Sequence, residues 1–432
     1  MDMPQSRHLS PARCPRDADA PLRICLLSYR SNPHSGGQGV YIKNLSRALK
    51  HLGHRVDVLT GPPQTLNVDP DINVHRLACL DLYDPSNPFR IPTLTELSDP
   101  VNLMEWLGVA TMGFPEPFTF GLRAWSFLRK NGHRYDIIHD NQSLSYGVWA
   151  ASRSVPSVAT IHHPITVDLR IAMAAAKPFW EKLKQLRWYA FIPMQKQVAR
   201  RLHRIITVSE CARRDIVDAF GIRQERCITV PNGIDTQLFR PLPGIQRDPN
   251  RVIVTNSADT PLKGLGHLLT AVDQLRRQGR AVKLVVIGAP KKNGVIERQV
   301  RSLDVGRLVT FTGRVSDAEL VRQYARASVA VVPSEYEGFG LPVGEAMACG
   351  VPVVSSTGGA LPEVVGEAGV LVPPADPQAL AAAITRLLEA PAQAEALGWA
   401  GYRRVQRHFS WEAAARKTIT VYRETIDAYH RP

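Results

Sequence analysis

Residues 329–355 read Val329-Ala-Val-Val-Pro-Ser-Glu-Tyr-Glu-Gly-Phe-Gly-Leu-Pro-Val-Gly-Glu-Ala-Met-Ala-Cys-Gly-Val-Pro-Val-Val-Ser355. The stretch opens with the apolar run Val329–Val332 and closes with a second one at Val353–Ser355. Between them, a glycine-containing loop leads into a helix that we expect to begin near Pro342, because proline is favoured in the first turn of a helix. A strand, a helix and a second strand whose apolar runs are continuous predict a parallel sheet that is covered on both faces.

The same alternation extends over most of the chain. Strands are predicted in the first half at Ile24–Ser28, Val56–Thr60, Ile137–His139, Val158–Ile161 and Ile205–Val208. In the second half they are predicted at Val252–Thr255, Leu284–Gly288, Val309–Phe311, Val329–Pro333 and Val353–Ser355. Helices are predicted between them at Tyr41–Leu52, Gly264–Gln278, Asp317–Ala325 and Pro377–Leu388. Two such sets predict an α/β fold of two doubly wound, Rossmann-like domains, with a ligand cleft between the carboxyl ends of their strands.

The predicted domain boundary lies in a segment rich in proline and glycine, residues 240–250, where no regular element is favoured. We therefore expect a disordered tail over residues 1–20, a first domain over 21–240 and a second over 250–410, followed by a last helix within 411–432. The segment Leu82–Gly121 breaks the strand–helix pattern with proline, asparagine and exposed-looking aromatic residues, which include Trp106, Phe114, Phe118 and Phe120. We expect this segment to be an irregular lid or binding loop.

Composition is that of an ordinary globular protein, with 44% hydrophobic and 21% charged residues in a chain of 432. We find neither an apolar run long enough to span a membrane nor the apolar stretch of a signal peptide at the N-terminus. The six cysteines are scattered and include no Cys-x-x-Cys pair, which favours a reducing compartment and predicts neither a disulfide framework nor a zinc site. The expected location is therefore the cytoplasm.

The net charge of +14 is concentrated in one segment, residues 170–204. This segment holds nine Lys or Arg residues against the single acidic residue Glu181, interleaved with aromatic residues such as Phe179, Trp180 and Trp188. A basic amphipathic stretch of this kind suits an anionic membrane surface or a phosphorylated partner. The alternative is a pair of partly exposed helices, separated by Pro178 and Pro193, whose apolar sides pack on the domain. Nucleic acid is not expected as a partner, because no recognition motif accompanies the charge.

Two loops carry residues suited to a phosphorylated sugar ligand. Glu337 precedes the helix predicted at Pro342 and Glu345 lies about one turn inside it, so that both carboxylates can address one ligand and accept hydrogen bonds from hydroxyl groups. Helix capping would explain one acidic residue there, but not the glycines beside Glu337. Near the N-terminus, Gly36 and Gly37 lie between a predicted strand and a helix, where backbone amides can approach an anion.

The stretch around Glu337 and Glu345 resembles the Glu-x7-Glu signature of retaining glycosyltransferases of the GT-B fold, family 4. Further blocks resemble the family in the expected order, and together the resemblance runs from roughly residue 22 to residue 428. They are the Gly36-Gly37 loop, Val230-Pro-Asn-Gly-Ile-Asp235, Lys263-Gly264, Ala348-Cys-Gly-Val-Pro-Val-Val354, Thr357-Gly-Gly-Ala-Leu-Pro-Glu363, Gly369-Val-Leu-Val-Pro373 and Phe409-Ser-Trp411.

The resemblance implies a role for each matching residue. Glu337 would contact hydroxyls of the transferred sugar, and Glu345 would hold the ribose of the nucleotide. Lys263 would neutralise the diphosphate, which is how a site without a metal can stabilise developing charge, while His162 would reach the donor sugar from the first domain. Backbone groups would line the sugar and diphosphate; they belong to Gly36, Gly37, Gly338, Phe339, Gly340 and Leu341. The last helix would cross back and pack on the first domain.

One position departs from the family. Ala258 stands where members usually carry an arginine that joins the lysine on the diphosphate, and losing such a contact costs about 1.5–3 kcal/mol if nothing replaces it. By residue type alone, the side chains of Asn256, Ser257, Lys291 or Arg314 could replace it.

Three other groups could carry chemistry. His162 and His163 are adjacent after a strand, so they should point to opposite sides and cannot chelate one metal well. Asp69-Pro-Asp71 imitates an Asp-x-Asp metal motif but is expected to be a turn. His139-Asp140-Asn141 closes a strand of the first domain and could touch the acceptor.

The implied function is a metal-independent, retaining transfer of a hexosyl residue from a nucleotide-diphosphate sugar. The acceptor would be lipid-linked or a polysaccharide, and the nucleotide sugar would be a co-substrate in the absence of any cofactor. Peripheral binding to the inner face of the cytoplasmic membrane would suit a lipid-linked acceptor. Two alternatives stay open: a catalytically silent protein that binds nucleotide sugars, and a nucleotide-sugar epimerase or phosphorylase of the same fold.

Overall fold

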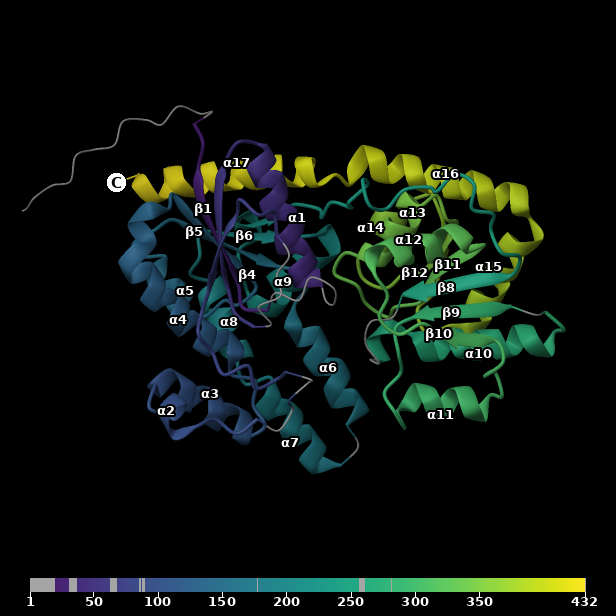
Figure 1. Cartoon of the computed structure of the whole chain (residues 1–432), viewed down its shortest axis with the longest axis horizontal. Coiled ribbons are helices and arrows are strands. Elements are labelled where there is room, and N and C mark those ends of the chain that lie inside the picture. The colour runs from purple at the N-terminus through teal and green to yellow at the C-terminus, as the bar shows by residue number, and fades with distance from the viewer. Residues whose placement is uncertain are drawn as a thin grey trace, which may run out of the picture.

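The computed structural model describes residues 20–30, 37–62, 68–84, 87, 90–176, 178–255, 261–280 and 282–431. These residues form two parallel β-sheets side by side, each with helices packed around it (Figure 1). The predicted fold of two doubly wound domains is confirmed. The boundaries of the domains and of the N-terminal tail stay a prediction, since residues 1–19 lie outside the described ranges.

The first sheet has seven parallel strands in the order β3-β2-β1-β4-β5-β6-β7. The strands are β1 (Arg23–Ser28), β2 (Arg55–Thr60), β3 (Asn73–Arg76), β4 (Ile137–Asn141), β5 (Ser157–Ile161), β6 (Arg204–Thr207) and β7 (Cys227–Thr229). The helices of this half are α1 (Gly37–His51), α2 (Leu94–Leu97), α3 (Pro100–Ala110), α4 (Glu116–Asn131), α5 (Tyr146–Ala151), α6 (Ile165–Ala175), α7 (Phe179–Trp188), α8 (Ile192–Ala199) and α9 (Glu210–Phe220). Short 3-10 turns span Gly132–Arg134 and Gln224–Arg226.

Chain order reverses between β1 and β4, the place where an open α/β sheet binds its ligand. In the register of the strands, Ser28 pairs with Asn141, and Asn141 pairs with Thr160. The carboxyl ends of β1, β4 and β5 therefore lie level with one another. The loop that follows β5 begins with His162.

The second sheet has six parallel strands in the order β10-β9-β8-β11-β12-β13. The strands are β8 (Arg251–Thr255), β9 (Lys283–Ile287), β10 (Val309–Phe311), β11 (Val329–Val332), β12 (Val353–Ser356) and β13 (Val370–Val372). The helices are α10 (Leu265–Arg277), α11 (Val295–Ser302), α12 (Asp317–Arg326), α13 (Leu341–Ala348), α14 (Leu361–Val365), α15 (Pro377–Glu389), α16 (Pro391–His408) and α17 (Trp411–His430), and a 3-10 turn spans Pro261–Lys263. Strand β11 lies next to β8, so the loop after β11 starts at the reversal point of this sheet.

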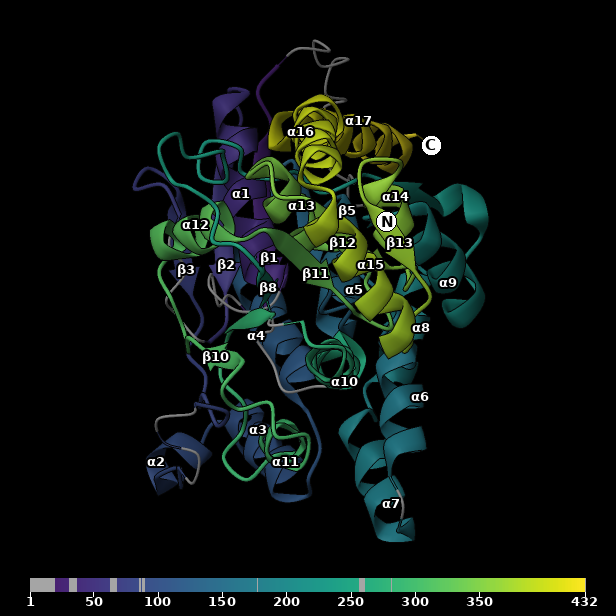
Figure 2. The ribbon, with the colours of Figure 1, turned by 90° about the vertical axis from the view of Figure 1, so that its right-hand side faces the viewer.

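The last two helices run along one side of the molecule, and α17 lies on the first domain (Figures 1 and 2). Ser410 interrupts the two helices and caps α17, its side chain accepting a hydrogen bond from the Ala413 amide. The buried residues of α17 recur every three or four positions and therefore share one face of the helix, which packs against the core that contains β1 and α1. They are Trp411, Ala414, Ala415, Thr418, Val421, Tyr422 and Thr425. The chain returns from the second domain to the first at Phe409, whose carbonyl accepts a hydrogen bond from the Ile234 amide at 2.8 Å. The two connections between the domains therefore run side by side.

The expectation of an irregular loop over Leu82–Gly121 is wrong for much of the segment. It contains α2, α3 and the first turns of α4. Thr93 and Glu96 form a capping box at α2, and Asp99 caps α3 with Pro100 at its first position, which are ordinary signals of helix starts. Phe120 is also buried rather than exposed, because it packs beside Tyr29 in the core of the first domain.

Candidate active site between the two domains

The loop between β11 and α13 is held in shape by its glycines and by Glu337. Gly340 has a φ of 98°, a backbone conformation that favours glycine, and it caps α13 ahead of Pro342. The Glu337 side chain contacts the 3-10 turn Pro261–Lys263 and its own loop: its Oε1 accepts from Lys263 Nζ at 2.7 Å and from Ser334 Oγ at 2.9 Å. The structure thus joins Glu337 and Lys263, which lie 74 residues apart, in one ion pair.

Gly338 brings this loop into contact with the first domain. A Cβ atom added to Gly338 would lie 2.2 Å from the carbonyl oxygen of His162, a distance no side chain can tolerate. The Gly338 carbonyl in turn accepts a hydrogen bond from Ser209 Oγ at 2.7 Å. The backbones of Gly338 and His162 therefore meet across the boundary between the two domains.

His162 is oriented by residues at the carboxyl end of the first sheet. Its Nε2 lies 2.7 Å from Asn141 Oδ1, its backbone amide donates to Gln142 Oε1 at 2.9 Å, and its ring packs edge-on against Tyr41. Burial lowers the pKa of His162 to about 3, so the imidazole is neutral at physiological pH. Because an amide oxygen only accepts, the Nε2 atom carries the proton and Nδ1 keeps a free lone pair.

The neighbouring histidines have other partners. His163 Nε2 lies 2.7 Å from Asp168 Oδ2 on α6, so His162 and His163 address different groups, as their alternation predicted. His139 Nδ1 lies 2.5 Å from the Tyr422 hydroxyl and Nε2 lies 2.6 Å from Thr160 Oγ1, and the residue is fully buried. The hypothesis that the 139–141 run faces an acceptor is therefore wrong for His139. It is also wrong for Asp140, which is buried and accepts from Ser143 and Leu144. Asn141 instead orients His162.

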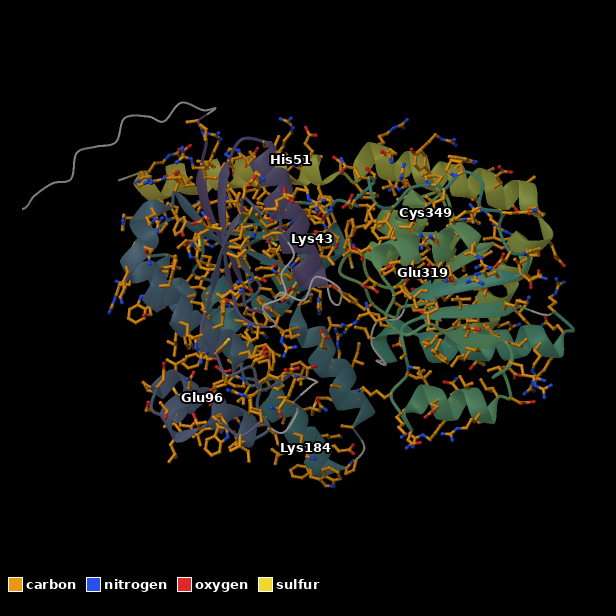
Figure 3. The ribbon with its side chains drawn as sticks, in the orientation of Figure 1. Lys43, His51, Glu96, Lys184, Glu319 and Cys349 are labelled. Carbon is orange, nitrogen blue, oxygen red and sulfur yellow. The ribbon has the colours of Figure 1, made fainter. Side chains whose placement is uncertain are left out.

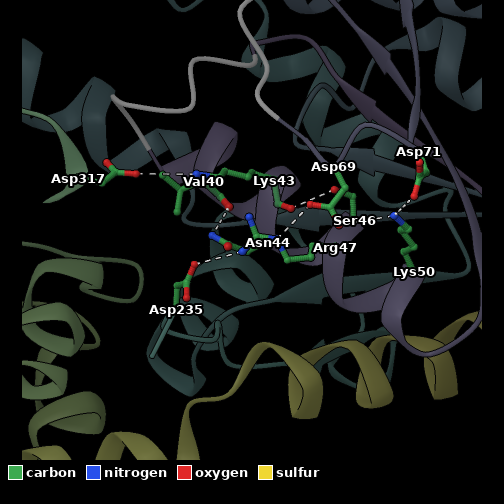
Figure 4. Close-up of polar contacts among 10 residues, drawn as sticks. All are labelled: Val40, Lys43, Asn44, Ser46, Arg47, Lys50, Asp69, Asp71, Asp235 and Asp317. Carbon is green, nitrogen blue, oxygen red and sulfur yellow. Dashed lines mark hydrogen bonds and ion pairs between the residues drawn. The ribbon is translucent and has the colours of Figure 1, made fainter. Parts of the chain in front are cut away.

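Glu345 lies on α13, inside the helix that follows the Glu337 loop. Burial, and to a lesser extent the negative charge of Asp317, raise the pKa of its carboxyl group to about 7, against a hydrogen bond from Tyr324 that lowers it. Asp317 begins α12 and lies 3.9 Å from Lys43 Nζ on α1 of the first domain. Figure 4 shows this contact, and Figure 3 places Lys43 at the boundary between the domains.

Asp69 and Asp71 lie in a turn, as expected, and their carboxylates are used in ion pairs. Arg47 Nε lies 3.3 Å from Asp69, and Lys50 Nζ lies 2.8 Å from Asp71 (Figure 4). Arg47 also contacts Asp235 at 3.3 Å, which joins α1 to the Val230–Asp235 block. Over the described ranges, no group of three or more His, Cys, Asp or Glu residues could hold a metal ion.

Several residues predicted for the site would contribute only backbone groups to it, and others fall outside the described residues. Gly37 starts α1, and Phe339 is buried in the core of the second domain, where its ring packs against Phe409. Leu341 is the first residue of α13. Gly36, Ala258, Asn256 and Ser257 lie outside the described ranges. Lys291 and Arg314 are both exposed, in the loops that follow β9 and β10.

Comparison with known proteins gives the same assignment for both halves of the chain. Residues 35–238 match the family model described as Glycosyltransferase Family 4, and residues 239–404 match the model described as Glycosyl transferases group 1. A protein named MMP alpha-(1->4)-mannosyltransferase from Mycolicibacterium hassiacum is 45% identical over 409 residues, which is 94% of this chain and 98% of that protein.

This chain belongs to glycosyltransferase family 4.

Two further relatives agree with this assignment. A D-inositol 3-phosphate glycosyltransferase from Kineococcus radiotolerans is 29% identical over 460 residues, covering 95% of this chain and 97% of that one. The solved structure titled sucrose-phosphate synthase from Thermosynechococcus elongatus is similar with a TM-score of 0.72 and 26% identity, covering 94% of this chain and 100% of that chain. The predicted family, the GT-B fold and the enzyme class are thereby confirmed, and the family 4 enzyme uses a nucleotide sugar as its donor.

Sequence reasoning missed the residues that join the two halves of this family 4 enzyme. Ser209 donates to Gly338, Tyr336 donates to Asp215, and Glu363 accepts from the first amides of α9. Glu363 was visible as the last residue of a family block, but its partners are more than 150 residues away in the chain. The ligand-contacting roles of Glu337, Glu345, Lys263 and His162 stay predictions.

Proposed function

We propose that the enzyme transfers an α-mannosyl residue, with retention at the anomeric carbon, from a nucleotide-diphosphate sugar to a hydroxyl group of a glycan. The sugar and the linkage class rest on the relative that is 45% identical over nearly its whole length and is named an alpha-(1->4)-mannosyltransferase. A donor whose diphosphate is α-linked, giving an α-linked product, undergoes transfer with retention. Mannose thus replaces the less specific hexose predicted from the sequence, and a glycan hydroxyl replaces the predicted lipid-linked or polysaccharide acceptor.

One observation supports the location of this activity: Gly338, which follows Glu337 in the chain, meets the His162 backbone of the first domain, and Glu337 is paired with Lys263. In the proposed complex, the backbone of residues 338–341 and that of Gly36 and Gly37 line the sugar and the diphosphate. Glu337 accepts hydrogen bonds from sugar hydroxyls. Closure of two domains around the donor excludes water and fixes the geometry of the reacting groups.

Charge stabilisation is assigned to Lys263. Its ammonium group is paired with Glu337 at 2.7 Å and is part-exposed, so it is available to a diphosphate that enters the same space. As the bond from the anomeric carbon to the diphosphate breaks, negative charge grows on the leaving oxygen, and a fixed cation lowers the energy of that state. The leaving diphosphate takes up the proton of the acceptor hydroxyl on the same face.

His162 is assigned to positioning the sugar rather than to proton removal. A pKa of about 3 makes its imidazole too weak a base to remove a hydroxyl proton at neutral pH. The hydrogen bond from Nε2 to Asn141 fixes the ring and leaves Nδ1 as an acceptor for a hydroxyl of the donor sugar.

The test is a panel of nucleotide sugars assayed for released nucleotide diphosphate, with and without an α-linked glycan acceptor, followed by determination of the product anomer. Glu337→Ala and Lys263→Ala should each abolish most of the turnover. Wild-type rates in both variants would overturn the site, a β-linked product would overturn retention, and release only from a non-mannosyl donor would overturn the sugar.

We further propose that the end of the first domain that carries α2, α3 and α7 contacts an anionic lipid surface. On α7, Phe179 is 80% exposed, and Trp180, Leu183 and Leu186 are each more than half exposed. Arg187 of α7 donates to Thr111 at 2.7 Å, so α7 lies beside the end of α3, which exposes Leu103, Met104 and Leu107. Figures 1 and 3 place α2, α7 and the labelled Lys184 at the same end of the molecule.

Charge and apolar exposure together support lipid as the partner. Lys182, Lys184 and Arg187 stand on α7 against Glu181 alone, a balance that favours anionic headgroups beside inserted aromatic side chains. Among the residues that the structure describes, no helix is long and apolar enough to cross a bilayer.

Flotation with phosphatidylserine-containing vesicles, compared with neutral vesicles at low and high salt, tests the contact. Binding should require anionic lipid and fall with salt, and Phe179→Glu with Leu183→Glu should abolish it, whereas Trp399→Glu, at an exposed residue of α16, should not. Absence of binding to anionic vesicles at low salt would overturn the proposal.

A further inference from the structure

Helix α9 of the first domain begins at the boundary with the second domain. Ser209 caps it, its Oγ accepting a hydrogen bond from the Ala212 amide at 3.0 Å. The two amides between the cap and Ala212, those of Glu210 and Cys211, have no acceptor inside their own helix, as is general for a first turn. Both donate to Glu363 of the second domain, at 2.9 Å to Oε2 and 2.6 Å to Oε1.

The carboxylate of Glu363 is well suited to this position. Each of its oxygens accepts one amide hydrogen, and its negative charge lies at the positive end of a helix of 11 residues. The backbone at Glu363 is itself held in place, because Arg404 of α16 donates to the carbonyls of Glu363 and Val364, both at 2.8 Å. The backbone that carries the Glu363 side chain is therefore anchored to α16 within the second domain.

The segment that leads into Glu363 is packed directly on the Glu337 loop. The Ala360 amide donates to the Glu337 carbonyl at 2.8 Å, and a Cβ atom on Gly359 would lie 2.3 Å from the same carbonyl oxygen. A Cβ atom on Gly358 would lie 2.5 Å from the carbonyl oxygen of Ser334. Residues 358–363 and the Glu337 loop are thus packed against each other as one unit, so a displacement of Glu363 should be passed on to Glu337.

Two more contacts join α9 to that unit. Ser209 Oγ donates to the Gly338 carbonyl at 2.7 Å, and the Tyr336 hydroxyl donates to Asp215 Oδ2 at 2.7 Å. These residues flank Glu337 on both sides in the sequence. One helix of the first domain therefore holds both loops that surround the proposed sugar site.

We propose that Glu363 is a positioning residue, whose bidentate contact with the start of α9 holds the two domains together and sets Glu337 and Gly338 against His162. This role rests on the proposed function of that site. In the open arrangement that must admit the donor, water replaces Glu363 at the two amides, and the contact re-forms as the domains close.

The experiment compares wild type with Glu363→Gln, Glu363→Ala and the control Glu367→Ala, an exposed glutamate four residues further along. Transfer is measured as kcat and KM, nucleotide binding by calorimetry with GDP and UDP, and the domain arrangement by small-angle X-ray scattering. Nucleotide affinity and Tm should stay near wild type, since Glu363 is not assigned a nucleotide contact. An amide group keeps only one of the two hydrogen bonds, so kcat/KM should fall in the order wild type, E363Q, E363A.

We expect at least about tenfold loss of kcat/KM in E363A, the scale of one lost charge-assisted hydrogen bond, with a larger radius of gyration than wild type in the presence of nucleotide. Wild-type kinetics and scattering in E363A would overturn the inference. A parallel fall of nucleotide affinity and Tm in E363A would also overturn it, by showing a general structural role. If the wild-type protein transferred no sugar at all, the proposed function would fail, while the scattering comparison would still decide whether Glu363 holds the domains together.

Discussion

The carbonyl oxygen of His162 and the α-carbon of Gly338 approach so closely that a methyl group on Gly338 would lie 2.2 Å from that oxygen. The contact joins the domain that carries the predicted sugar-binding histidine to the loop that carries Glu337. It leaves no room for any residue other than glycine at position 338.

Gly338→Ala should lower kcat/KM about 100-fold, because the loop or the domain must shift by about 1 Å to relieve the clash, and displacements of that size have such effects on rate. Stability should change little, since the contact lies between domains rather than inside a core. Gly306→Ala is the control, because a Cβ atom there would meet only Val300 Cγ1, at 3.9 Å. Steady-state kinetics decide the point, and an active G338A variant with an unchanged KM would show that the contact is not required.

Lys263→Ala should remove about 1.5–3 kcal/mol of transition-state stabilisation, which is roughly a 10- to 150-fold loss of kcat/KM. The physical reason is the loss of the cation proposed to balance the leaving diphosphate. Lys263→Arg should recover part of the rate, because the charge is restored on a bulkier group. Lys283→Ala should leave the rate unchanged, because Lys283 is the first residue of strand β9 and lies at the end of the sheet opposite the candidate site. Equal rates in K263A and K283A would contradict the assignment.

Glu345 should make nucleotide binding release a proton below neutral pH. Its pKa is about 7 in the donor-free protein, so a large fraction is protonated at pH 6.5, whereas a carboxylate that accepts from ribose hydroxyls must be ionised. Calorimetry with GDP and UDP in buffers of different ionisation enthalpy measures the released proton. Glu345→Gln should release less, which separates this proton from those of the nucleotide phosphates. An identical release in E345Q would exclude the role.

The same group should contribute to the pH dependence of stability. The folded pKa of about 7 lies above the reference value of 4.5, so the folded chain holds a proton that the unfolded chain loses between these values. This contribution is complete below pH 4.5 and is lost as the pH rises through 7, with a magnitude of about 3 kcal/mol at most. Urea unfolding at pH 5, 6, 7 and 8 should show the decline in wild type and a flatter profile in Glu345→Gln. A profile of E345Q that parallels wild type would assign the decline to other groups.

Tyr422→Phe should destabilise the protein by about 1–3 kcal/mol without changing KM for the donor, because it leaves a ring nitrogen of the fully buried His139 without its partner. Burial already lowers the pKa of His139 to about 3, so charging the ring cannot compensate at neutral pH. Tyr429→Phe, which removes the hydroxyl of a more exposed tyrosine on the same helix, should have a smaller effect. Equal midpoints of unfolding for the two variants would show that the His139 contact contributes little.

The core strands of both sheets were predictable because their apolar runs are continuous, as in Val329–Val332, and such runs have few alternatives once both faces are covered. Helices α2 and α3 were not predicted, although Thr93 and Asp99 carry ordinary capping signals, because the prolines and asparagines around them obscure the periodicity. For the site, the glutamate pair and Lys263 could be read from the family resemblance. The partners of His139 and Glu363 could not, since they depend on how α17 and the second domain are placed in space.

The paired connections at Ile234 and Phe409 also limit how the enzyme can open. The two segments that link the domains are joined by this hydrogen bond, so together they define a single line about which one domain can rotate. Sliding of one domain past the other would have to stretch or separate both connections at once. Opening should therefore be a rotation that moves Glu363 and Gly338 away from the first domain together, so that the donor enters from the side opposite α16 and α17.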